Sequence, residues 1–167
     1  MSPALDRWLH LARRFTGSLR PGGPAPGDER WVADQLDARE LALWDRLSAP
    51  DRRHAVTVAR ATVAALGPET PRPVVAAALL HDVGKLDSHL RTPARVVATL
   101  SAMVVGRERV PGRMGSYLHH DEIGADMLAA AGSDPLVVTW AREHHLPPSR
   151  WTITPRVANA LKAADDD

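Results

Sequence analysis

A short apolar run that ends in a polar doublet is the feature that most constrains how this chain can fold. Ala77-Ala78-Leu79-Leu80 is followed at once by His81-Asp82, and Val83-Gly84-Lys85 comes next. A run this apolar must be buried, and an imidazole beside a carboxylate is costly to bury unless something compensates both groups. A divalent metal ion is the obvious candidate. The chain is therefore expected to gather further ligands around this doublet.

The composition indicates one globular domain built from helices. The chain has 167 residues, of which 44% are apolar and 25% charged, and this length suits one sizeable core. Aromatic residues make up only 4%, and the apolar residues are mostly Ala, Leu and Val in segments that favour helix. No stretch alternates convincingly with a period of two residues, as a strand would. We therefore predict an all-α fold.

Charge and cysteine content narrow the kinds of partner and site. The formal net charge is +1, so no global field attracts nucleic acid or anionic lipid. The absence of cysteine excludes disulfides, thiolate metal sites and cysteine nucleophiles. The longest mostly apolar run, residues 96–105, is about half as long as a membrane span, and the N-terminus is a poor signal peptide. We expect a cytoplasmic protein without a membrane partner, of unknown oligomeric state.

Proline, glycine and capping residues divide the chain into eight expected helices. Residues 1–27 are interpreted as a short helix followed by a Pro/Gly linker over 21–27, and residues 28–167 as the main domain. In this domain Gly84 is placed to end the helix that carries His81-Asp82, and residues 106–115 form a Gly- and Arg-rich loop. The helices of the domain are expected at 28–47, 51–66, 73–82, 92–105, 116–131, 134–145 and 154–167.

Residue types that bind metals recur at about one position per expected helix. Helical bundles build metal sites in this way, because facing helices converge their side chains in the core. His81 and Asp82 are adjacent and point about 100° apart on a helix, so both reach one metal region only near the helix end. The candidate positions are His54, His81, Asp82, His119, His120, His144, His145 and Asp165.

The order and local sequence of these residues resemble the HD superfamily of metal-dependent phosphohydrolases. Four segments carry the resemblance: Arg53–Val58, Leu79–Lys85, His120–Ala125 and Ala163–Asp165. They span about two thirds of the chain and leave the first 50 residues unmatched. The order H…HD…H…H…D is similar to that of the two-metal branch, which includes symmetrical dinucleoside-tetraphosphate hydrolases and the HD domain of ribonuclease Y. No Gly-Tyr-Pro motif follows His81, which counts against the HD-GYP phosphodiesterases.

The resemblance implies an HD-domain helical bundle, with an N-terminal helical appendage, and a two-metal centre. Divalent Fe, Mn, Co, Ni or Zn suits mixed imidazole and carboxylate ligands. Two such ions can generate hydroxide at neutral pH and hold the oxygens of a displacement at phosphorus. The implied ligands are His54, His81, Asp82 and Asp165 for one ion, and His120, His144 and His145 for the second, with Asp82 bridging.

The function implied by the resemblance is hydrolysis of a phosphoester or phosphoanhydride bond, through a metal-bound hydroxide, in a nucleotide or a related small phosphorylated substrate. Asp82 and Lys85 are the implied catalytic residues, with Lys85 neutralising phosphate charge in the transition state. The alternative is a non-catalytic HD-type module that binds a nucleotide or a partner, although the complete ligand set favours turnover. A nuclease that acts on RNA is less favoured, because the net charge is near zero and no nucleic-acid module accompanies the domain.

Three points stay open from the sequence. His119 and His120 face different directions, and the segment after His120 favours it as the ligand. Asp165 is either a ligand or part of a frayed acidic tail. The five arginines between residues 91 and 113 form either a solvated face or a basic rim that receives substrate phosphates.

Overall fold

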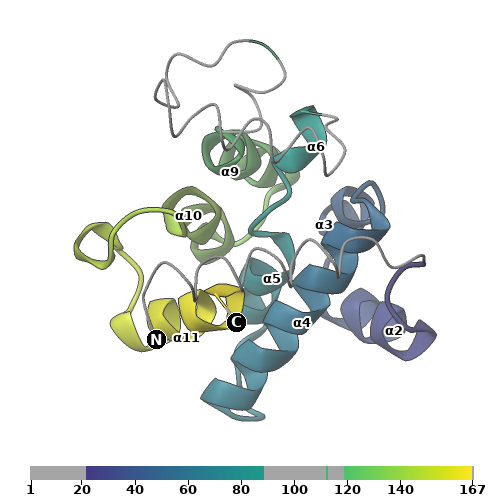
Figure 1. Ribbon diagram of the computed structural model, residues 1–167, viewed down its shortest axis with the longest axis horizontal. Helices are drawn as coiled ribbons and strands as arrows, with labels where there is room; N and C mark the ends of the chain where they lie inside the picture. Colours follow the sequence, from purple (N-terminus) through teal and green to yellow (C-terminus); the bar gives the residue numbers. More distant parts are fainter. Residues whose placement is uncertain (1–21, 89–111, 113–118, 167) are drawn as a thin grey trace, which may run out of the picture.

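Helices make up every regular element in the part of the chain that the computed structural model describes, residues 22–88, 112 and 119–166. The all-α prediction is therefore confirmed. The expected helices near the N-terminus and at 92–105 lie outside the described residues, as does the Gly- and Arg-rich loop apart from Gly112. The elements, labelled in Figure 1, are α2 (Pro26–Gln35), α3 (Ala38–Trp44), α4 (Ala49–Leu66), α5 (Arg72–Leu80), α6 (Lys85–Ser88), α9 (His120–Ala131), α10 (Pro135–Glu143), the 3-10 helix η2 (Pro148–Arg150) and α11 (Pro155–Asp166).

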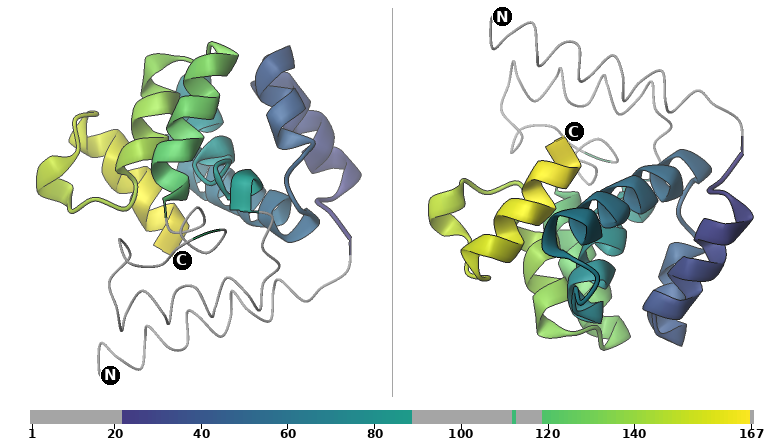
Figure 2. Two further views of the ribbon diagram at one scale, coloured as in Figure 1. Left: turned by 90° about the horizontal axis from the view of Figure 1, so that it is seen from above. Right: turned by 90° about the horizontal axis from the view of Figure 1, so that it is seen from below.

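Helix α5 is the core of the domain. Every residue from Val74 to Leu80 is buried, as expected for a helix that is apolar on all sides. Helices α4 and α10 pack against α5, while α11 packs on α4 and α9 on α10. Figures 1 and 2 show α5 in the middle of this arrangement, with α4 and α11 side by side on one flank and α9 and α10 on the other. The residues that follow α5 therefore lie among α4, α9, α10 and α11.

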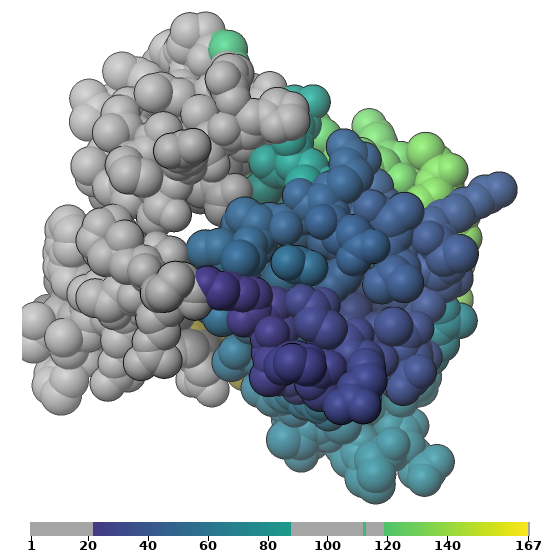
Figure 3. Space-filling model, turned by 90° about the vertical axis from the view of Figure 1, so that its right-hand side faces the viewer, coloured from purple at the N-terminus to yellow at the C-terminus, as the bar shows by residue number. Residues whose placement is uncertain are grey.

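Helices α2 and α3 share this core although they precede the segments that resemble the HD superfamily. Val32, Leu36 and Trp44 belong to the same buried cluster as α5. The Trp44 indole Nε1 donates a hydrogen bond to Glu29 Oε2 at 3.1 Å, which joins the two helices. Figure 3 shows them forming one continuous surface with α4 on this side of the molecule. A start of the main domain near residue 28 stays a prediction that this shared core supports.

The expected single helix over 28–47 is wrong. Helix α2 begins at Pro26, inside the expected linker, and ends at Gln35, after which Leu36 has extended backbone. Asp37 then starts α3 through a reciprocal capping box: its carboxylate accepts the Arg39 and Glu40 amides, and the Glu40 carboxylate accepts the Asp37 amide. Capping satisfies backbone groups that a continuous helix would bond internally, so the chain turns here.

The expected role of Gly84 as the end of its helix is also wrong. Helix α5 ends at Leu80, and His81 to Gly84 form a turn that leads into α6. Gly84 is required instead by a close approach to α9, because a Cβ at this position would lie 1.9 Å from the His120 carbonyl oxygen. Helix α10 likewise ends at Glu143, two residues before its expected end. By contrast, Gly132 ends α9 as predicted, with a left-handed φ of 80°.

Among the described residues, no helix is long and apolar enough to cross a membrane.

Candidate metal centre

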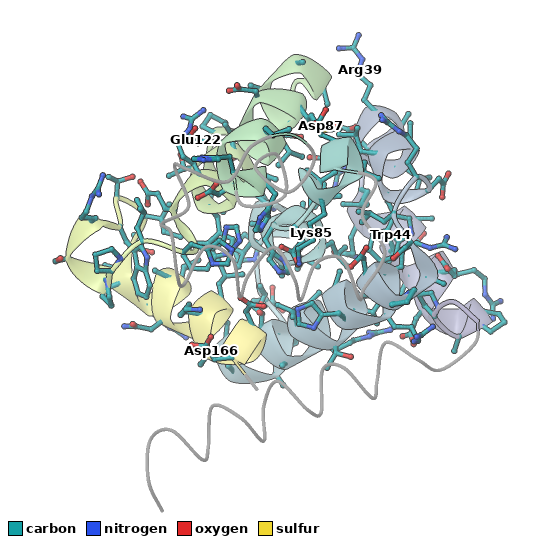
Figure 4. All side chains as sticks on the ribbon, turned by 45° about the horizontal axis from the view of Figure 1, so that its top comes forward. Arg39, Trp44, Lys85, Asp87, Glu122 and Asp166 are labelled. Atoms are coloured by element: carbon teal, nitrogen blue, oxygen red, sulfur yellow. The ribbon has the colours of Figure 1, made fainter. Side chains whose placement is uncertain are left out.

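Side chains from six helices and their ends meet beyond the C-terminal end of α5. The turn that follows α5 carries His81 and Asp82, and Lys85 begins α6. Figure 4 shows Lys85 near the middle of the molecule, between α9 and α4. The other contributors are His54 in α4, His120 at the start of α9, His144 and His145 directly after α10, and Asp165 in the last turn of α11.

These residues form two clusters. Within each cluster, every residue offers one nitrogen or oxygen ligand atom, and these atoms all lie within 4.8 Å of one another. Cluster A consists of His54, His81 and Asp165, and cluster B of Asp82, His120, His144 and His145. All seven residues that the sequence nominated as ligands thus lie in one cluster or the other. His119 lies in neither; it is the half-buried residue before α9. The geometry therefore favours His120 over His119.

The Asp82 carboxylate lies between the two clusters. Its Oδ2 is 3.4 Å from His81 Nε2 in cluster A. Its Oδ1 is 3.1 Å from His120 Nε2 and 4.0 Å from His144 Nε2 in cluster B. Since each oxygen faces a different cluster, one carboxylate can serve both.

Backbone carbonyl groups orient two of the imidazoles. His81 Nδ1 donates to the Ala78 carbonyl oxygen and His144 Nδ1 to the Ala141 carbonyl oxygen, both at 2.9 Å. Each histidine directly follows its helix, where the last carbonyl groups have no intrahelical partner. A carbonyl can only accept, so Nδ1 must carry a proton and the lone pair of a neutral ring is on Nε2. Both Nε2 atoms are buried and make no hydrogen bond.

Burial and two carboxylates set the protonation of the cluster A groups. Burial alone lowers the pKa of His81, but Asp82 and Asp165 outweigh it and raise this pKa to about 10. For Asp165, burial raises the pKa, and the neighbouring imidazoles of His54 and His81 outweigh this effect and hold the pKa well below its usual range. His81 is therefore a cation at neutral pH whenever no other positive charge occupies this position.

In cluster B, the His144 imidazole has the opposite character. Burial, together with the neighbouring His145 and His81, holds the pKa of His144 well below its usual value. The pKa of Asp82 is also low, because Lys85 and His81 outweigh the opposing effect of burial. A neutral imidazole beside an ionised carboxylate is the protonation state that metal ligation requires.

The residues present fit divalent metal ions. His54 Nε2 and Asp165 Oδ1, His120 Nε2 and Asp82 Oδ1, and His145 Nε2 and His120 Nε2 are each 3.1 Å apart. Ligand atoms about 2.1 Å from one ion are about 3 Å apart when they subtend a right angle. The two buried Nε2 atoms without hydrogen bonds would gain a partner from the same ions. Their role as metal ligands stays a prediction that this geometry supports.

Lys85 lies against the carboxylate of Asp82. Its Nζ forms an ion pair with Asp82 Oδ2, and its side chain is only 11% exposed. The expected partner was a substrate phosphate, and that role stays a prediction. The contact places a cationic amine directly beside the carboxylate that lies between the clusters.

Hydrogen bonds that the sequence pattern does not reveal stabilise the segment after His145. Glu143 is buried, and its two carboxylate oxygens accept the amide and the hydroxyl of Thr152, each at 2.7 Å. The Trp151 indole donates to the carbonyl oxygens of Glu143 and Leu146. These bonds close the segment that follows the two histidines. Nothing in the local sequence distinguishes Glu143 from an exposed helical glutamate.

An all-α domain that converges histidines and aspartates from separate helix ends has the architecture in which helical bundles build metal sites. The comparison with family models identifies the family: the HD domain model matches residues 52–166, so the chain belongs to the HD domain family. Proteins of this family bind divalent metals and are generally hydrolases. The comparisons with curated proteins and with solved structures found no match.

Proposed function

We propose that this protein is a two-metal phosphohydrolase that cleaves a phosphoester or phosphoanhydride bond in a nucleotide or a related small phosphorylated substrate. The observation that carries the proposal is the position of Asp82 between two clusters of imidazoles and carboxylate. A single metal ion would leave the nitrogen and oxygen atoms of one cluster without a metal to ligate.

Cluster A would hold one ion and cluster B the other, with Asp82 contributing one oxygen to each. Divalent ions bound here would lower the pKa of a coordinated water and polarise a phosphoryl oxygen. Ala78 and Ala141 keep His81 and His144 in the tautomer that offers Nε2. Mixed imidazole and carboxylate ligands favour Fe, Mn, Co, Ni or Zn.

The charge balance of the site favours an anionic substrate. The two clusters contain two carboxylates, Asp82 and Asp165, and their imidazoles are neutral when they ligate. Two divalent ions therefore leave a local charge of about +2, and Lys85 adds one more. A phosphate group supplies the negative charge that this centre lacks. Lys85 then exchanges its contact with Asp82 for a phosphate oxygen and stabilises the charge that develops during cleavage.

Metal quantification followed by a turnover screen tests the proposal. Purified protein is loaded with Mn, Fe, Co or Ni and offered dinucleoside polyphosphates, cyclic nucleotides, nucleoside mono- and triphosphates and short RNA. We expect about two ions per chain and hydrolysis of at least one nucleotide class. Nucleotide binding without hydrolysis under every metal would favour the non-catalytic module instead.

Two substitutions separate the roles of the clusters. His81→Ala should weaken the binding of one ion, whereas Asp82→Ala should weaken the binding of both. Asp82→Ala should also lower turnover by more than about 100-fold, because losing a ligand costs more than losing a group that only hydrogen-bonds to a ligand. Asp126→Ala is the matched control, since Asp126 is exposed on α9 and forms a salt bridge with Arg142 on the surface. Unchanged metal content and activity in Asp82→Ala would contradict the proposal.

A further inference from the structure

Two glycines from distant parts of the sequence meet at the boundary between the clusters. Gly84 lies in the turn that carries His81 and Asp82, and Gly124 lies one helical turn after His120 in α9. Both are buried. Figure 1 shows α6, which follows the turn, beside α9, and the two helices are in contact.

The contact between them is backbone against backbone. A Cβ at Gly84 would lie 1.9 Å from the His120 carbonyl oxygen and 2.6 Å from the Gly124 nitrogen. A Cβ at Gly124 would lie 3.0 Å from the Gly84 nitrogen, 3.4 Å from the Gly84 Cα and 3.4 Å from Val83 Cγ1. Backbone atoms cannot rotate away as a long side chain can. A side chain at Gly84 must therefore separate α9 from the turn, and one at Gly124 must move the turn and α9 apart by a few tenths of an ångström.

This separation would change one cluster and leave the other. Cluster A rests on α4, α11 and His81 and has no residue on α9. In cluster B, His120 is on α9, while Asp82 is on the turn and approaches His120 Nε2 to 3.1 Å. A displaced α9 would move His120 away from Asp82, while His54 and Asp165 of cluster A lie on α4 and α11.

We infer that Gly124 is a positioning residue: the missing side chain lets α9 approach the 81–84 turn closely enough for Asp82 to be shared between two ions. The inference rests on the proposed function, since it assumes two ions. It goes beyond that function by assigning the coupling of the ions to a backbone contact. Helix propensity alone would favour alanine at position 124, because Gly in a helix interior is disfavoured relative to Ala. The glycine therefore needs another reason, and the close contact with the turn supplies one.

Mn²⁺ binding to Gly124→Ala tests the inference without relying on activity. Equilibrium dialysis gives the affinity and number of ions, and electron paramagnetic resonance distinguishes an exchange-coupled pair of Mn²⁺ ions from isolated ones. The wild type should bind two coupled ions. Gly124→Ala should keep the first ion within about twofold and bind the second at least about tenfold more weakly, as expected when ligand orientation is disturbed. Its residual signal should be that of an isolated ion.

Gly27→Ala is the matched control. Gly27 is exposed in the first turn of α2, and a Cβ there would meet nothing within 4 Å. This variant should bind Mn²⁺ as the wild type does. Circular dichroism checks that each variant keeps its helices. If Gly124→Ala fails to fold, the double variant Val83→Ala/Gly124→Ala removes the Cγ1 contact and is measured in its place.

The outcomes separate this inference from the proposed function. Two coupled ions in the wild type together with two equally tight, coupled ions in folded Gly124→Ala, or in the double variant, would overturn the inference and leave the proposed function standing. One ion in the wild type would overturn the two-metal proposal and the inference together. Selective loss of the second ion and of the coupling would support both.

Discussion

At the scale of single residues, His81 lies between two carboxylates that favour its protonated form. Its Nε2 lies 3.4 Å from Asp82 Oδ2 and 3.5 Å from Asp165 Oδ1, and the ring is buried. The carboxylates raise the pKa of His81 to about 10 against the effect of burial. A metal ion and this proton would compete for the same nitrogen.

We therefore predict that metal loading at pH 8 releases the His81 proton, in addition to the proton of a metal-bound water whose pKa the ion lowers below about 8. His144 contributes none, because its pKa is well below its usual value and the ring is already neutral. Since the proton competes for Nε2 below pH of about 10, the apparent metal affinity should fall about tenfold for each unit of pH decrease while other ligands stay deprotonated. A pH indicator in weakly buffered solution measures the release. Metal uptake without proton release at pH 8 would contradict the prediction.

The same shift sets how the metal-free fold responds to pH. A raised pKa means that the folded state binds the proton more tightly than the unfolded chain. The stabilisation from protonated His81 is therefore complete below the ordinary histidine pKa of 6.5 and is lost as pH rises towards about 10.

At the scale of elements, the site is built from helix ends more than from helix faces. His81 and His144 directly follow α5 and α10, His120 begins α9, and Asp165 lies in the last turn of α11. The segment after α10 needs its own support, which Glu143 and Thr152 provide through two bonds of 2.7 Å. That support should matter to cluster B, because the segment directly follows His145.

Replacing Thr152 by valine removes one of the two bonds to Glu143 and keeps the shape of the side chain. Hydrogen bonds to charged groups contribute about 1.5–3 kcal/mol, and Thr152 is itself exposed, so we expect a loss near the lower end, about 1.5 kcal/mol. At about 2–4 °C per kcal/mol for a domain of this size, the melting temperature should fall by several degrees. The ion at cluster B should also bind more weakly than the ion at cluster A.

Thr57→Val is the control for this substitution. Thr57 is exposed on α4, and its hydroxyl donates to the Arg53 carbonyl oxygen at 3.1 Å. Its melting temperature should change little. Equal effects of the two substitutions on stability and metal binding would contradict a supporting role for Glu143 and Thr152.

The elements also show how far sequence reasoning reaches. Apolar periodicity and capping residues predict α4 and the end of α9 well, because these signals are local. The break at Asp37 was missed because its capping box competes with an equally plausible continuous helix. Gly84 was assigned to the wrong role because its reason lies in α9, which is distant in sequence. The seven proposed ligands were nominated from the pattern, but the sharing of Asp82 depends on distances that only the fold provides.

At the scale of the whole molecule, the two clusters bring together residues from helices that lie on opposite flanks of α5. Cluster A joins α4 and α11 to the turn after α5, and cluster B joins α9 and the end of α10 to the same turn. Without ions, the two buried carboxylates and their neighbouring imidazoles have only one another and Lys85 to compensate the cost of burial. Bound ions should therefore stabilise the fold as a whole.

Removal of the ions with a chelator should lower the melting temperature. Ligand at about 100 times its Kd contributes about 2.7 kcal/mol per site, so two sites contribute about 5 kcal/mol. Hydrogen exchange should increase most in the last turn of α11 and at the start of α9, where Asp165 and His120 lie. Adding Mn²⁺ back should restore both properties. An unchanged melting temperature after complete metal removal would count against metal ions as part of the folded structure.

The bonds from His81 and His144 to the carbonyl groups of Ala78 and Ala141 have a consequence for how this site can drift in evolution and be copied in design. The acceptors belong to the backbone, so the side chains at positions 78 and 141 make no hydrogen bond that aims either ring. Both alanines are fully buried, so packing, and not ligand orientation, limits which residues can replace them. A designer who needs a metal-ready imidazole can place a histidine directly after the last residue of a buried helix and let that helix supply the support.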